Sequence, residues 1–230
     1  MFEDLPTVRE AFQRTVRLVT TARLRDPVLK PLADTEEELA ALAELEGATS
    51  ARLIGQQSGT SGVQSTEFVY GVPHANFINA SFAYAKPREP NRFNGADRGA
   101  WYAALNVETS LAEVIYHMQE VLEAAGDFNA TVEYTEMFAS FAGEFVDLRQ
   151  ADPNADYLNP NKKIGYPAGN AVADMARSKG LNGIIYPSVR HPGGTCIAAL
   201  LPHAVQSVAQ GDIYRIVWTG NRVPSVTKVQ

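Results

Sequence analysis

Arginine, tyrosine and glutamate side chains that can do chemistry gather in one short part of the chain, residues 91–117. A loop broken by glycines carries Arg92 and Arg98, an apolar strand with Tyr102 follows, and a helix with Glu113 comes next. A guanidinium can make two parallel hydrogen bonds to a phosphate or a carboxylate. An aromatic face can stack on a flat or cationic ring. The segment therefore holds the groups that bind an anionic small molecule, with a carboxylate nearby.

Each of these residues also has an ordinary structural interpretation. Arg92 can be a solvated loop residue, although neighbouring glycines let a ligand approach the backbone closely. Trp101 and Tyr102 face opposite sides of their strand, and either or both can pack in the core. Glu113 lies opposite the apolar stripe of its helix, where solvent or a capping interaction is the usual environment. Spacing alone leaves these alternatives open.

A second polar concentration follows the apolar strand 183–186. It contains Ser188, Arg190 and His191, followed by two glycines. A serine at a strand end is usually a turn former. The other histidines have no partner at the spacing of metal ligands, and we expect them to be structural or at the surface.

Composition restricts the class of protein. A chain of 230 residues with 45% hydrophobic residues can bury one core, so we expect a single domain over residues 1–230. The net charge of -6 and the absence of a Lys/Arg cluster argue against direct nucleic-acid binding. One cysteine, Cys196, allows no internal disulfide, and no metal-ligand spacing occurs. No signal peptide or membrane span is apparent, which predicts a cytoplasmic protein without membrane association.

Hydrophobic spacing predicts a helical N-terminal extension over residues 1–60. Helices are expected over residues 7–20 and 35–47, with a third short helix through Arg52. Short strands or irregular segments are expected at 68–70, 77–78 and 82–84.

Strands and helices alternate irregularly after residue 100. The expected strands are 101–105, 131–137, 144–148, 183–186, 195–201 and 213–218, and the expected helices run from about 111 to Gly126 and from Pro167 to Gly180. This order predicts an α+β fold. No GxGxxG or GxxxxGK[ST] loop is present, which disfavours a doubly wound nucleotide-binding fold.

Two of these segments together carry a family resemblance. RFNGADRGAWYAALNVETSLAEVIYH and GLNGIIYPSVRHPGGTCIAALLP resemble the paired signatures of the RES domain family, named for its arginine, glutamate and serine. The resemblance covers a core signature region of about residues 91–202. It implies an ADP-ribosyltransferase-like fold, with a mixed split sheet and flanking helices around an NAD-binding cleft.

The resemblance also implies roles for individual residues. Arg92, Glu113 and Ser188 match the family arginine, glutamate and serine, and are expected to be catalytic. Tyr102 matches the family tyrosine. The residues expected to bind NAD are Arg17, Arg92, Tyr102 and Arg190, with Arg52 competing with Arg17 for the position of the early family arginine.

The activity that the resemblance implies is cleavage of the nicotinamide–ribose bond of NAD by a toxin of a bacterial toxin-antitoxin pair. ADP-ribose would pass to phosphate or water, as in an NAD phosphorylase or glycohydrolase. NAD is then a substrate, phosphate a co-substrate, and no metal or other cofactor is expected. The implied partner is an Xre-like antitoxin. The chain is expected to form a homo-oligomer, or a hetero-oligomer with that antitoxin. A protein ADP-ribosyltransferase and a non-catalytic nucleotide-binding module are the alternatives.

Overall fold

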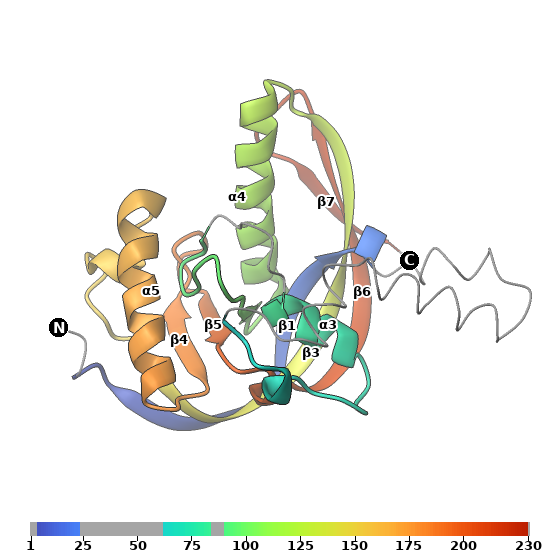
Figure 1. Cartoon of the computed structure of the whole chain (residues 1–230). Coiled ribbons are helices and arrows are strands. Elements are labelled where there is room, and N and C mark those ends of the chain that lie inside the picture. Colours follow the sequence, from blue (N-terminus) through green and yellow to red (C-terminus); the bar gives the residue numbers. More distant parts are fainter. Residues whose placement is uncertain (1–3, 24–61, 84–89, 230) are drawn as a thin grey trace, which may run out of the picture.

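A mixed β-sheet with helices on both faces forms the body of the protein. The computed structural model describes residues 4–23, 62–83 and 90–229 (Figure 1). Within them, the strands are β1 (Thr7–Thr20), β2 (Trp101–Ala104), β3 (Asn129–Asp147), β4 (Gly183–Pro187), β5 (Thr195–Ala199), β6 (Gln206–Thr219) and β7 (Ser225–Val229). The α-helices are α3 (Ala75–Ala83), α4 (Val107–Ala125) and α5 (Lys162–Ser178), with single 3-10 turns η1 (Thr21–Arg23), η3 (Ser65–Glu67), η4 (Asp156–Leu158) and η5 (Pro202–Ala204). The predicted α+β class is confirmed.

The long strand β3 organises the sheet because it pairs with three other strands. One edge of β3 pairs antiparallel with β1. The opposite edge pairs antiparallel with β6 up to Ser140, and then in parallel with β4 from Phe145 onward. The sheet therefore splits along this edge into one arm of β6 and β7 and another of β4, β5 and β2.

The second arm curves back to the first strand. Strand β2 pairs with β5 and also touches β1 at a single bridge between Val16 and Ala104. Strands β1, β2, β5, β4 and β3 consequently form a closed ring. This closure places β1 beside β2 as well as β3, although these segments are far apart in the sequence.

Three hydrophobic clusters hold the helices to the sheet. Helix α3 packs its Ile78 and Phe82 on the face of the sheet that carries Trp101 and Ile197. Helix α5 packs its inner face, including Val172, on the opposite face of β4 and β5. The apolar stripe of α4 packs over β1, β3 and β6. Helices α4 and α5 thus stand on different arms of the split sheet (Figure 1).

Helix α4 is delimited by its caps. The Asn106 side chain accepts a hydrogen bond from the backbone N–H of Thr109 at 2.9 Å, and Gly126 ends the helix with a φ of 69°. A side-chain cap commonly begins a helix, and a glycine in the left-handed conformation commonly ends one. The predicted end at Gly126 is confirmed, while the beginning lies a turn earlier than the apolar stripe suggests.

The helix predicted over residues 7–20 is wrong, because this segment is strand β1. Its first half is buried on one face only, a bulge follows between Phe12 and Thr15, and its second half is buried on both faces, with Leu18 and Val19 in different clusters. The shift in phase at the bulge places apolar residues three and four apart, which imitates a helix.

Other boundaries also differ from the prediction. Residues 75–83 form α3, where short strands or irregular segments were expected. The two strands expected over 131–148 are one strand, β3. Pro167 lies inside α5, which begins at Lys162 after the Asn161 cap. Strand β7 was not predicted, and it is short and almost fully exposed.

The remaining N-terminal predictions fall on residues 24–61, outside the described part of the chain. They include the helix 35–47, the short helix through Arg52, and most of the helical extension. No helix in the described residues is long and apolar enough to cross a membrane.

Candidate active site

A cavity of about 480 Å³ opens between α4, α5 and the ring of strands. This volume lies in the range of small-molecule sites, roughly 300–1,000 Å³. Five of the six predicted site residues line the cavity, namely Arg17, Arg92, Tyr102, Glu113 and Arg190. They come from β1, the loop before β2, β2 itself, α4 and the turn after β4. The fold thus brings together residues from three separate regions of the sequence, namely Arg17, the segment 92–113 and Arg190.

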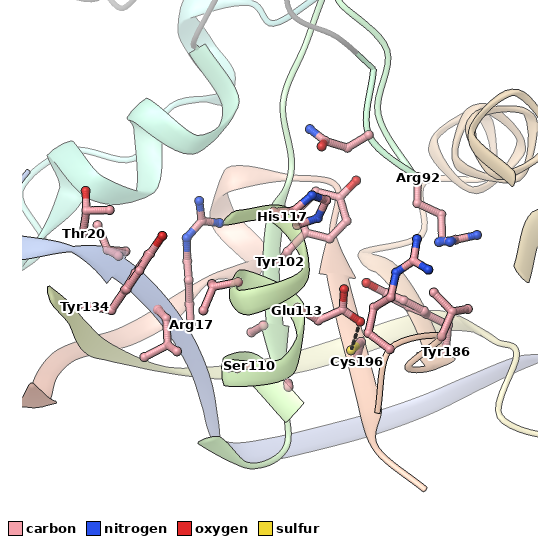
Figure 2. A pocket seen from close by; sticks show the side chains of 18 of the residues that line it. Arg17, Thr20, Arg92, Tyr102, Ser110, Glu113, His117, Tyr134, Tyr186 and Cys196 are labelled. Atoms are coloured by element: carbon pink, nitrogen blue, oxygen red, sulfur yellow. Dashed lines mark hydrogen bonds between the residues drawn. The ribbon is translucent and has the colours of Figure 1, made fainter. Parts of the chain in front are cut away.

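Glu113 lies at the centre of this arrangement. Its side chain points from α4 toward β4 and β5 (Figure 2). The Ser188 hydroxyl donates a hydrogen bond of 2.7 Å to Glu113 Oε1, and Cys196 Sγ lies 3.9 Å from the same oxygen. The solvent face that helical periodicity suggests for Glu113 is therefore a cavity wall.

Ser188 holds Glu113 and does not itself line the cavity. Its hydroxyl oxygen accepts hydrogen bonds from the backbone N–H groups of Arg190 and His191, at 3.1 and 3.0 Å. These two contacts direct the hydroxyl proton toward the Glu113 carboxylate. The same hydroxyl therefore both shapes the turn and orients the Glu113 carboxylate.

Arg92 is buried between its loop and α5, with only 6% of its surface exposed. Its Nη1 donates to the carbonyl oxygens of Tyr157 and Asn159, at 2.9 and 3.0 Å. Burial lowers the pKa of the guanidinium from its usual value. Gly165 and Gly169 make room on α5, because a Cβ there would lie 2.7 Å from Arg92 Nη1 and 2.1 Å from the Arg92 carbonyl oxygen, respectively.

Tyr102 fastens the Arg92 loop to the sheet. Its hydroxyl donates to Asn94 Oδ1 at 2.8 Å and accepts from the Phe93 backbone N–H at 3.0 Å. Burial raises the pKa of this phenol, so the hydroxyl stays protonated at neutral pH. The Tyr102 ring lines the cavity, while Trp101 is in the core on the other face of β2, as strand alternation predicts.

Two further arginines line the cavity, Arg17 from β1 and Arg190 from the turn after β4. The Arg17 guanidinium lies 4.7 Å from the centre of the Trp101 ring. The Arg190 guanidinium lies 3.5 Å from the centre of the Tyr116 ring and donates to the Pro160 carbonyl at 3.0 Å. Arg98, the second arginine of the loop, points away and forms an ion pair with Glu67 at 2.9 Å. Arg52 lies outside the described residues.

The comparison with protein families agrees with this geometry. A family model described as the RES domain matches residues 68–219, which include β2, α4 and the Ser188 turn. The chain belongs to the RES domain family.

Comparisons with curated sequences and with solved structures give no further family assignment. No curated protein sequence matches this RES protein significantly. Among solved structures, it is similar to a chain of the M. tuberculosis MbcT-MbcA toxin-antitoxin complex, with 12% identity, a TM-score of 0.37, and coverage of 89% of this chain and 86% of the other.

Several cavity residues of this RES protein were not predicted. They are Tyr134, Tyr166, Tyr186 and Cys196, together with His117, which was expected to be structural or at the surface. His117 had a usable signal, since it follows Glu113 by four residues and so shares its helix face. Burial, more than any nearby charge, raises the pKa of the Cys196 thiol to about 12. Within residues 4–23, 62–83 and 90–229, no three His, Cys, Asp or Glu side chains gather around a metal-sized space.

Proposed function

We propose that this RES protein cleaves the nicotinamide–ribose bond of NAD and transfers the ADP-ribose to phosphate or water. The observation that carries the proposal is the Glu113 carboxylate, oriented by Ser188 at the wall of a cavity that three arginines line. This arrangement combines a fixed negative charge for a cationic transition state with positive charges for the phosphates of a dinucleotide.

The carboxylate suits the bond that breaks. When the bond between the nicotinamide nitrogen and the ribose C1 carbon breaks, its electron pair goes to nicotinamide and positive charge develops on the sugar. A carboxylate beside the ribose stabilises this charge more in the transition state than in the ground state. Nicotinamide leaves as a neutral ring, so the reaction needs no proton donor at the leaving group.

The arginines suit the anionic parts of the reaction. Arg17, Arg92 and Arg190 line the cavity from three directions and can hold the pyrophosphate of NAD. One of them can also neutralise an attacking phosphate, whose oxygen forms the new bond to the ribose C1 carbon. Attack by phosphate yields ADP-ribose phosphate, and attack by water yields ADP-ribose with release of a proton.

We further propose that this activity makes the chain a toxin with an Xre-like antitoxin partner. Membership of the RES family supports this assignment. Expression of the chain alone should stop bacterial growth as cellular NAD falls, and co-expression of the cognate antitoxin should restore both. Growth arrest without a fall in NAD would contradict this proposal.

Incubation of the purified chain with NAD tests the reaction directly. We expect stoichiometric release of nicotinamide, with a product whose mass is that of ADP-ribose in phosphate-free buffer. Added phosphate should shift the product by the mass of a phosphoryl group if phosphate is the acceptor. Intact NAD after prolonged incubation would contradict the proposed function. ADP-ribose that becomes covalently attached to protein would indicate a protein ADP-ribosyltransferase.

A further inference from the structure

The turn that carries Ser188 is fastened to α4 at two points, one helical turn apart. Ser188 bonds to Glu113, and His191 bonds to Thr109, four residues earlier on the same helix. We propose that Thr109 and His191 are positioning residues, which act on the proposed NAD cleavage by fixing the Ser188–Glu113 contact. The inference rests on the proposed function and assigns roles to residues outside the cavity lining.

The contact between Thr109 and His191 is short, and its Thr109 side is buried. Thr109 Oγ1 lies 2.8 Å from His191 Nδ1, and Thr109 has no exposed surface. The backbone N–H of Thr109 is itself held by the Asn106 cap. The hydroxyl therefore projects from the capped first turn of α4, and His191 binds to a fixed point.

The backbone of His191 carries this constraint from Thr109 to Ser188. The backbone N–H of His191 donates to Ser188 Oγ at 3.0 Å, and the Ser188 N–H donates to the Gly194 carbonyl at 2.8 Å. A shift of His191 would move one of the two donors that orient the Ser188 hydroxyl. The hydroxyl would then no longer direct its proton at Glu113.

The packing at Gly194 shows how little space this contact leaves. A Cβ at Gly194 would lie 2.5 Å from Thr109 Oγ1 and 3.0 Å from His191 Nδ1. The turn therefore approaches α4 as closely as a backbone without a side chain allows. Such an approach keeps Thr109 and His191 in register with Ser188 and Glu113.

Neither positioning residue lines the cavity, which gives a kinetic expectation. Loss of the Thr109–His191 hydrogen bond should lower kcat for nicotinamide release and leave KM for NAD within about twofold. Arg17 and Arg92 lie on other segments, and the Arg190 side chain is held separately by the Pro160 carbonyl and the Tyr116 ring. The same loss should have no effect once Ser188 is gone, because the constraint acts through Ser188.

A double-mutant cycle tests this inference. Thr109→Val keeps the shape of the side chain and removes its hydroxyl, and we expect kcat to fall about tenfold. Thr109→Ser keeps the hydroxyl and should stay within about twofold of wild type. In a Ser188→Ala background, Thr109→Val should change kcat by less than about twofold.

His191 provides a second route if Thr109→Val does not fold. His191→Asn retains a polar atom at the position of Nδ1 and should keep most of the activity, whereas His191→Leu should lose it about tenfold. An unchanged kcat in Thr109→Val or His191→Leu, or an equal loss with and without Ser188, would overturn the inference. Failure of the wild-type chain to release nicotinamide would instead contradict the proposed function.

Discussion

At the scale of single residues, the site has side chains that line the cavity and other groups that hold those side chains in place. Glu113, Arg92 and the Tyr102 ring face the cavity, whereas Ser188 and the Tyr102 hydroxyl fix their positions. A carboxylate or guanidinium acts on a transition state only when it is already oriented, because reorientation during the reaction costs free energy. In the proposed reaction, the hydrogen bonds that hold Glu113 and the Arg92 loop would therefore contribute to the rate.

Cys196 provides a test of the electrostatic environment around Glu113. Burial and the nearby Glu113 charge raise the pKa of its thiol to about 12, so the thiolate form is nearly absent at about pH 8. We expect iodoacetamide at about pH 8 to label Cys196 at least about a hundredfold more slowly in the folded chain than in urea. The urea-unfolded chain is the control, and equal labelling rates would contradict the predicted environment.

At the scale of elements, local patterns predict helices and strands well where one pattern, an apolar stripe or an apolar run, continues without interruption. Helix α4 and strands β2, β4 and β5 follow their sequence patterns. Strand β1 does not, because its bulge and its two-sided burial remove the alternation. The pairing of Glu113 with Ser188 was equally inaccessible to local patterns, since 75 residues separate them and only the closed ring brings them together. Family resemblance, not periodicity, predicted that both residues belong to one site, and their hydrogen bond was not predicted.

The approach of the Arg92 loop to α5 depends on a glycine. Gly169→Ala places a Cβ 2.1 Å from the Arg92 carbonyl oxygen, so the loop must move away from the helix. We expect urea titration to show a loss of about 1–3 kcal/mol in the free energy of unfolding. Initial rates should show a higher KM for NAD. Ala171→Ser on the exposed face of α5 is the matched control, and wild-type behaviour of Gly169→Ala would contradict the close packing.

The pairing of β1 with β3 should depend on pH. Arg149 bridges Glu10 of β1 and Asp147 of β3, at 2.8 and 2.7 Å, and its hydrogen bonds lower the pKa of Asp147. A lowered carboxyl pKa contributes stability above the unfolded value of about 3.9, and this stability is lost as the pH falls through the folded pKa.

Arg149→Met should therefore lower the urea midpoint at about pH 7 and have a smaller effect at about pH 2.5. Arg215→Met, which removes a more exposed ion pair with Glu133, should have little effect at either pH. The same destabilisation by Arg149→Met at both pH values would contradict this role.

At the scale of the whole molecule, the split of the sheet creates the cavity. Helix α4 packs on β1, β3 and β6, and α5 packs on β4 and β5, so the strand surface between the two helices stays uncovered. The closed ring then delivers Arg17 from the first strand to the same place (Figure 2). A binding site at the junction of two arms needs no dedicated phosphate-binding loop, which is consistent with the absence of such motifs from the sequence.

The rate of nicotinamide release by Glu113→Gln, compared with wild type, tests the central claim most directly. Glutamine keeps the shape and one acceptor for Ser188 but removes the charge, so we predict a loss of at least about a hundredfold in kcat with an unchanged fold. Glu108→Gln, at an exposed position on the same helix, should retain the wild-type rate. Wild-type activity of Glu113→Gln would contradict the assignment of this cavity as the site of NAD cleavage.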